Sequence, residues 1–192
     1  MASNPVTKVT EEQYLAIDRA AEIRSEFVDG EMVAMSGGSM RHAQLQGNVF
    51  GELFVALRGS DCRVYSSDFR VRVSKTRMYA YPDVSVVCGK PVLADDHQDI
   101  LLNPIVIFEV LSPSTEKYDR GVKFQHYRGI DSLKDYVLVD QDRLRLEHYT
   151  RQDTDTWTLH DYQRLDDELK ITLIGVSLPL SRIYDRVELP GA

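Results

Sequence analysis

The sequence contains no apolar run long enough to cross a bilayer, and residues 1–13 are polar where a signal peptide would be apolar. Cysteine is scarce as well. The only two, Cys62 and Cys88, provide no disulfide framework. Each lies in a strand-like segment, so we expect buried, reduced thiols. Together these absences predict a cytoplasmic protein without a membrane segment.

Several common catalytic signatures are missing. The segment SGGS at 36–39 is not followed by the Lys-Ser/Thr of a phosphate-binding loop. Ser112 and Ser114 lack the flanking glycines of a nucleophile elbow, and neither cysteine stands in a thiol-catalysis motif. Four histidines show no zinc-ligand spacing: His97, His126, His148 and His160.

Basic residues are fewer than acidic ones: the sequence has 23 Lys and Arg and 30 Asp and Glu, which gives a net charge of −7. A nonspecific duplex binder usually presents a basic surface, so this acidity counts against a nucleic-acid role. It does not exclude one, since carboxylates around a metal add negative charge. Segment 58–77 is the best candidate for a local basic face, although a solvated strand face explains it equally well. Its basic residues are Arg58, Arg63, Arg70, Arg72, Lys75 and Arg77.

The remaining pattern is that of one globular domain spanning 1–192, with 43% hydrophobic and 28% charged residues. Asp29-Gly30 predicts a tight hairpin. The order of elements indicates a mixed α/β domain with a largely antiparallel sheet and helices packed on it. Helical patterns cover about 11–22, 40–57 and 112–127. Strand patterns cover 62–66, 68–73, 83–88, 104–111, 135–140, 143–149, 156–162 and 169–175.

Glu109 is the most informative residue. It lies in PIVIFEVL, an apolar run typical of a strand buried on both faces. Side-chain alternation places it on one face with Ile105, Ile107 and Leu111. A carboxylate among aliphatic side chains costs on the order of several kcal/mol unless it is paired, protonated or metal-bound. We therefore expect a partner nearby.

Asp83 is the natural partner. It follows Pro82 at the start of the strand DVSVVC, a position where proline is tolerated. If this strand neighbours 104–111, the carboxylates of Asp83 and Glu109 meet at one edge of the sheet. Two oxygen-rich side chains with open positions suit Mg²⁺, which keeps several waters.

The helix after Glu109 adds a third element. Asp119, Lys123 and Tyr127 are spaced by four and line one helix face, which can look toward Glu109. A lysine there could orient a water or neutralise charge on a phosphoryl group. The plain alternative is an Asp119–Lys123 helix pair worth a few tenths of a kcal/mol. Two unexplained strand carboxylates favour the functional interpretation.

An ordered set of segments resembles a known family: YPDVSVV, IFEVLSPST, YDRGVKFQHY and DYVLVD. The opening RSEFVDGEMVAMSGGSMRHAQLQGNV matches too, with Glu26, Gly30 and His42 in place. Over about 10–179 the chain is similar to the bacterial "putative restriction endonuclease" family, once known as a domain of unknown function, in the PD-(D/E)XK superfamily. The resemblance implies a four-stranded mixed core sheet flanked by helices, often with extra strands. It also implies Mg²⁺-dependent phosphodiester cleavage.

One position departs from the superfamily pattern. The usual lysine lies two residues after the acidic residue, where this chain has Leu111. The resemblance suggests that Lys123 replaces it, four residues before Tyr127, as in the Gln-x-x-x-Tyr helix of related exonuclease-like domains. Glu26, Asp119, Tyr127 and His42 are possible accessory residues. Glu26 could equally be a surface strand residue, and His42 a capping or packing residue.

The sequence thus predicts a restriction-endonuclease-like α/β fold with additional antiparallel strands. It predicts a DNA endonuclease in which Asp83 and Glu109 bind Mg²⁺, with Mn²⁺ as a substitute, and Lys123 assists. The alternative is a non-catalytic binding or structural module. We expect Lys123→Ala to abolish cleavage with folding nearly intact. We also expect a homodimer, because duplex cutting needs two sites and 171–180 is apolar enough to cover a partner, unless it closes the chain's own core.

Overall fold

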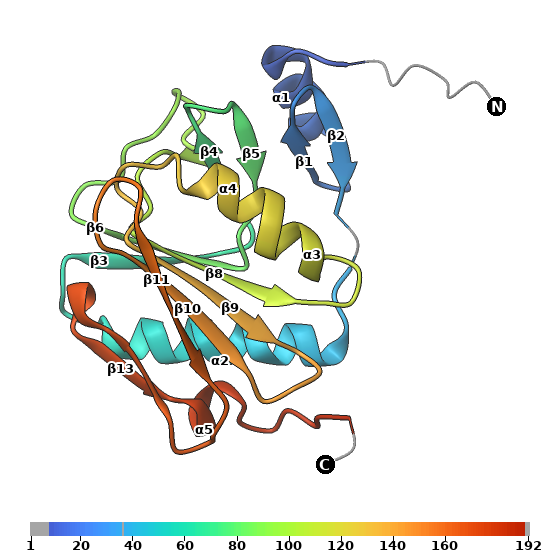
Figure 1. Ribbon diagram of the computed structural model, residues 1–192. Coiled ribbons are helices and arrows are strands. Elements are labelled where there is room, and N and C mark those ends of the chain that lie inside the picture. The colour runs from blue at the N-terminus through green and yellow to red at the C-terminus, as the bar shows by residue number, and fades with distance from the viewer. Residues whose placement is uncertain (1–7, 36, 191–192) are drawn as a thin grey trace.

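The computed structural model describes residues 8–35 and 37–190 (Figure 1). The N-terminal residues 1–7 and Ser36, on which the signal-peptide and SGGS arguments partly rest, lie outside this part of the chain. At the centre is a six-stranded sheet in the order β11-β10-β9-β8-β6-β3, with β8 and β9 parallel and the other pairs antiparallel. Its strands are β3 (Cys62–Ser66), β6 (Val84–Cys88), β8 (Val106–Leu111), β9 (Asp135–Asp140), β10 (Leu146–Arg151) and β11 (Trp157–Tyr162).

A five-stranded sheet in the order β2-β1-β5-β4-β7 and a β12–β13 hairpin complete the strands. The bounds are β1 (Ser25–Val28), β2 (Glu31–Ala34), β4 (Arg70–Val73), β5 (Met78–Ala80), β7 (Ile100–Leu101), β12 (Glu168–Ile171) and β13 (Val176–Pro179). The helices are α1 (Glu11–Ala20), α2 (Met40–Ala56), α3 (Glu116–Tyr118), α4 (Phe124–Tyr127) and α5 (Leu180–Ile183). A π-helical turn, η1 (Asp119–Lys123), joins α3 to α4, and a 3₁₀ turn, η2 (Thr172–Ile174), precedes β13.

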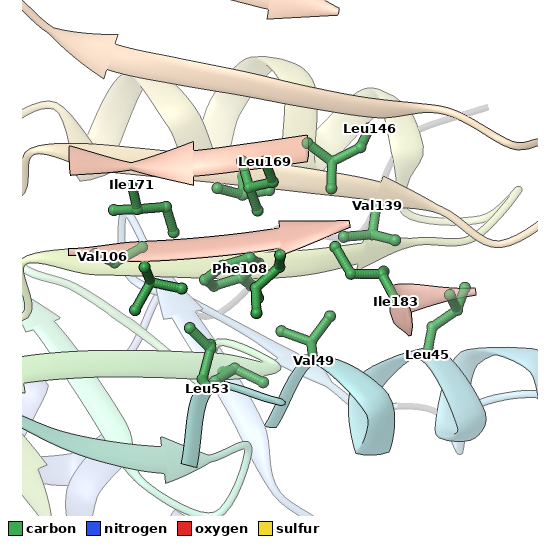
Figure 2. Close-up of a cluster of buried hydrophobic side chains, with 14 of the residues drawn as sticks. Leu45, Val49, Leu53, Val106, Phe108, Val139, Leu146, Leu169, Ile171 and Ile183 are labelled. Atoms are coloured by element: carbon green, nitrogen blue, oxygen red, sulfur yellow. The ribbon is translucent and has the colours of Figure 1, made fainter. Parts of the chain in front are cut away.

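Helix α2 covers one face of the central sheet. Its buried residues Leu45, Val49 and Leu53 recur every fourth position, which places them on one side of the helix. They meet inward-facing side chains of β8, such as Phe108, and the C-terminal hairpin extends the same core (Figure 2). The predicted helix at 40–57 is therefore confirmed.

The opposite face of the sheet is covered by α3, η1 and α4, with the five-stranded sheet and α1 beyond them (Figure 1). Tyr127 and Tyr136 are completely buried in this second core. Strand β8 contributes alternate residues to the two cores, with Ile107 on this side and Phe108 on the other. A strand buried on both faces leaves Glu109 no route to solvent except at the strand end.

The C-terminal apolar segment packs within the chain. Ile171, Val176, Leu178 and Leu180 are buried in the core that α2 forms with the central sheet. The idea that this segment covers a partner is therefore wrong, and its alternative, closure of the chain's own core, holds. The homodimer itself stays a prediction, which a monomer mass in light scattering at micromolar concentration would contradict.

The two cysteines do not match the expectation of buried, reduced thiols. Cys62 and Cys88 lie directly opposite each other in the β3–β6 pair, are only half-buried, and form a disulfide. The sequence did not predict this pairing, because the register between two strands distant in the chain is set by the sheet and not by the local pattern. The cytoplasmic expectation loses one of its premises, since disulfides are rare in reducing compartments.

The arginine-rich segment does not form a free basic face. Arg70 is 3% exposed and pairs with Asp18 at 2.6 Å, and Arg72 pairs with Glu11 at 2.8 Å. Lys75 lies 2.6 Å from Asp131. Most of these positive charges are matched by carboxylates from other segments, which sequence order alone does not reveal.

The fold class is confirmed: mixed sheets flanked by helices, with β10 and β11 extending a mixed four-stranded unit of β9, β8, β6 and β3. Within residues 8–35 and 37–190, no helix has the length and apolarity needed to cross a membrane.

Candidate active site

The sheet brings Asp83 and Glu109 together. Asp83 immediately precedes β6, and the antiparallel register pairs Val84 with Phe108, so the next pair along the ladder would be Asp83 and Glu109. Val84 and Phe108 face α2, and alternation turns the two carboxylates to the other face. The two carboxylates therefore lie at the same end of neighbouring strands, and their sharing of a metal stays a prediction.

Asp83 is held by the backbone of β8 and by α2. Its Oδ2 accepts a hydrogen bond of 2.6 Å from the Val110 N–H, and His42 Nε2 lies 3.4 Å from the same oxygen. His42 is fixed near the start of α2, where its N–H donates to the capping Ser39 hydroxyl at 3.1 Å. Burial lowers the pKa of His42, but the hydrogen bond and charge of Asp83 outweigh it and the net pKa is raised. This contact favours the imidazolium form.

Lys123 stands at the centre of a carboxylate cluster. Its Nζ lies 2.9 Å from Glu26 Oε1, 3.1 Å from Glu109 Oε1 and 3.4 Å from Asp119 Oδ1. The Lys123 side chain is only 8% exposed. Burial opposes its charge, but the carboxylates, Glu109 and Glu26 first, raise the pKa of Lys123 well above its ordinary value. The residue therefore remains an ammonium ion at neutral pH.

Glu109 lies behind Lys123. The Tyr127 hydroxyl donates a 3.0 Å hydrogen bond to Glu109 Oε1, which also contacts the ammonium. Burial raises the pKa of Glu109 well above its usual value, and the charge of Lys123 opposes that rise. The pKa of Asp119 is raised for the same reason, again against Lys123. The positive charge of one ammonium, that of Lys123, thus faces the carboxylates of Glu26, Glu109 and Asp119.

These groups border a cleft of about 430 Å³. The residues that line the cleft come from the β1–β2 hairpin, the start of α2, the loop after β8, and α3 and η1. Asp83, Glu26, Asp119, Lys123 and His42 all line it. Glu109 and Tyr127 do not line it and support its floor from behind. All seven candidate residues are thus gathered in one region, five of them in the cleft wall.

Sequence reasoning missed two side chains in the cleft wall. Tyr118 lies just before Asp119, and Gln141 follows β9 and accepts a 2.8 Å hydrogen bond from Ser39 Oγ at the start of α2. Neither residue belongs to a spacing pattern that marks a site. The π-turn at 119–123 does mark the region, since such turns often occur at functional positions, but it is visible only in the structure.

A second buried network supports the site from behind. Asp18 accepts hydrogen bonds of 2.6 Å from both Arg70 Nη2 and the Tyr81 hydroxyl, and another of 2.6 Å from the Ser25 N–H. Tyr81 in turn donates its N–H to Glu26 Oε1 at 3.4 Å. This network connects α1, β1 and β4 and so fixes the approach of Glu26 to Lys123.

The donor set suits a hard cation. Asp83 and Glu109 offer carboxylate oxygens, and Mg²⁺ typically takes one or two carboxylates while keeping waters or phosphate oxygens. In the part of the chain that the structure describes, the one group of three potential ligand side chains within 4.8 Å of one another is Asp61, Cys62 and Cys88, and its two cysteines are joined in the disulfide. The carboxylates of Glu26, Glu109 and Asp119 instead surround the Lys123 ammonium.

Comparison with known proteins places the chain in a family. The Uma2 family, described as "Putative restriction endonuclease", matches residues 11–181. The chain belongs to this family. The resemblance inferred from the motifs at 24–49, 81–87, 107–115, 118–127 and 135–140 is thereby confirmed.

Sequence and structure comparisons also find individual relatives of the chain. Two uncharacterized proteins of Synechocystis sp. are 36% identical over 95% of this chain and 94% of their own length, and 32% identical over 88% and 97%. A crystal structure from Anabaena variabilis, of a "putative nuclease belonging to DUF820", superposes with a TM-score of 0.76 at 16% identity. It covers 92% of this chain and 97% of that one, and it shows the shared fold.

Proposed function

We propose that the protein is a metal-dependent endonuclease that hydrolyses phosphodiester bonds of DNA. The observation that carries this proposal is the set of three carboxylates around a buried ammonium at a cleft, in a chain of the Uma2 family. A structural ion pair needs one partner for Lys123, and this site supplies three. Buried groups with strongly perturbed pKa values in a cleft are typical of functional sites.

In this proposal Asp83 and Glu109 would hold Mg²⁺ or Mn²⁺. The metal would supply a water of lowered pKa and a Lewis acid for a phosphoryl oxygen. Lys123, fixed by Glu26 and Asp119, would orient that water or neutralise charge that develops on the phosphate. His42, whose Nε2 lies 3.4 Å from Asp83 Oδ2, would act as an accessory residue and could donate a proton to a leaving oxygen.

The test pairs a site carboxylate with a distant one. Asp83→Asn removes a charge from the cleft, whereas Asp153→Asn changes an exposed loop residue whose carboxylate accepts hydrogen bonds from its own turn. With Mn²⁺ in excess, wild type and Asp153→Asn should rise in melting temperature, because a ligand of the native state stabilises it by mass action. Asp83→Asn should lose that rise together with cleavage of plasmid and oligonucleotide DNA.

A non-catalytic binding module is the second candidate. Two observations favour it: Leu111, in the usual lysine position, is 2% exposed in the core, and the arginines of 58–77 are largely paired. If wild type shows the Mn²⁺-dependent rise but cuts neither DNA nor RNA, the binding module replaces the nuclease. If Mn²⁺ causes no rise in wild type, the metal site itself is refuted.

A further inference from the structure

Tyr118 lines the cleft, and its hydroxyl is buried without a hydrogen-bond partner. In the described chain, seven buried side-chain N or O atoms lack a hydrogen bond, and Tyr118 is the one among these residues that lines the cleft. A buried polar atom without a partner costs stability, on the order of 1–3 kcal/mol. Such atoms are rare in native structures and require an explanation. Here the cleft offers one.

The surroundings of the Tyr118 ring define what it could bind. Lys123 Nζ lies 5.8 Å from the ring centroid, which places the residue on the charged side of the cleft. Burial first, and then the charge of Glu26, raise the pKa of Tyr118 far above its usual value, although Lys123 opposes this. The phenol therefore stays protonated at neutral pH. It is a hydrogen-bond donor among groups that are mostly acceptors.

Charged hydrogen-bond donors are few in this cleft. Its charged lining consists of the acceptors Glu26, Asp83 and Asp119 together with the donors Lys123 and His42. Lys123 is already shared among three carboxylates, and His42 is turned toward Asp83. A phosphodiester brings two anionic non-bridging oxygens, and each needs a donor or a cation to be bound beside so many carboxylates.

We propose that Tyr118 is a substrate-binding residue whose hydroxyl donates a hydrogen bond to a non-bridging oxygen of the scissile phosphodiester. This inference rests on the proposed nuclease function and names a contact within it. In this assignment the substrate supplies the acceptor for the Tyr118 hydroxyl. No other described residue combines a place in the cleft wall with an unused buried donor.

The experiment compares two tyrosines on either side of η1, Tyr118 at the end of α3 and Tyr127 at the end of α4. Tyr118→Phe removes a hydroxyl without a partner, whereas Tyr127→Phe removes one that donates to Glu109 at 3.0 Å. Without ligand, Tyr118→Phe should unfold at the wild-type temperature or above it, and Tyr127→Phe should unfold below it. This difference separates a binding role from a structural one.

The binding probe is thymidine 3′,5′-bisphosphate, titrated calorimetrically with saturating Mn²⁺. Loss of one hydrogen bond to a charged oxygen should raise its Kd about tenfold in Tyr118→Phe, the ratio that corresponds to 1.4 kcal/mol. The Mn²⁺ affinity measured without nucleotide should stay within about twofold, because Tyr118 would contact phosphate and not metal.

Three results would overturn the inference: an unchanged Kd for the bisphosphate, a loss of Mn²⁺ affinity without nucleotide, or destabilisation of Tyr118→Phe as large as that of Tyr127→Phe. Each can occur while wild type still cuts DNA, in which case the nuclease function stands and the Tyr118 contact fails. Conversely, a weakened bisphosphate affinity in Tyr118→Phe, with no cleavage by wild type, would support the phosphate contact and refute the nuclease.

Discussion

Replacing Lys123 by methionine tests the charge balance of the site. Methionine keeps a comparable apolar length but removes the ammonium that lies within 3.4 Å of Glu26, Glu109 and Asp119. Breaking a buried ion pair by removing one partner typically costs about 3–5 kcal/mol, because the other charge stays buried. For a domain of this size that loss lowers the melting temperature by roughly 6–20 °C. The structure therefore replaces the expectation from sequence that folding survives loss of Lys123 nearly intact.

The pH dependence has a definite sign. The pKa of Glu109 is raised in the folded protein, so the folded state binds a proton more tightly than the unfolded state, and stability falls as pH rises from the ordinary glutamate value toward the folded value. Lys123 opposes that rise in pKa, so Lys123→Met should raise the pKa of Glu109 further. The gap in stability between wild type and variant should consequently be widest near pH 7 to 8 and should shrink as pH is lowered toward about 5.

Urea unfolding at several pH values, with and without Mn²⁺, measures both effects. Lys75→Met is the matched control, because Lys75 pairs with Asp131 on the surface, with side chains 60% and 81% exposed. Such a pair contributes about 0–1 kcal/mol. Mn²⁺ should stabilise Lys123→Met more than wild type, since a divalent cation replaces the missing charge. Equal midpoints for wild type and Lys123→Met at pH 7 and pH 5 would refute the reasoning.

Two further predictions concern the supports of the site. His42→Gln should be less stable than wild type at pH 5 to 6. This difference in stability should vanish as pH rises through the raised folded pKa of His42, because the imidazolium contact with Asp83 is lost there. A stability difference that stays constant with pH in thermal unfolding would contradict the contact. Asp18→Asn should cost about 3–5 kcal/mol in urea unfolding, because Arg70, whose side chain is 4% exposed, loses its main carboxylate. An Asp95→Asn control, on the partly exposed Arg19 pair, should cost far less.

Local patterns in the sequence determined the elements and the chemistry of the site. The four-residue repeat of Leu45, Val49 and Leu53 defined α2, and the apolar run around Glu109 identified a central strand, because helix and strand periodicities act over a few residues. The cost of a carboxylate in such a strand singled out Glu109. The order of the short motifs along the chain then identified the family.

Only the tertiary structure decided which distant residues meet. The disulfide between Cys62 and Cys88, the pairing of Arg70 with Asp18, and the burial of 171–180 all depend on strand register and on packing between elements far apart in sequence. Glu26 reaches the cleft for the same reason, because β1 lies far from β8 in the sequence and only the packing of the two sheets brings it to Lys123. Contacts of this kind are selected by the global packing of two cores against one sheet, and no local propensity encodes them.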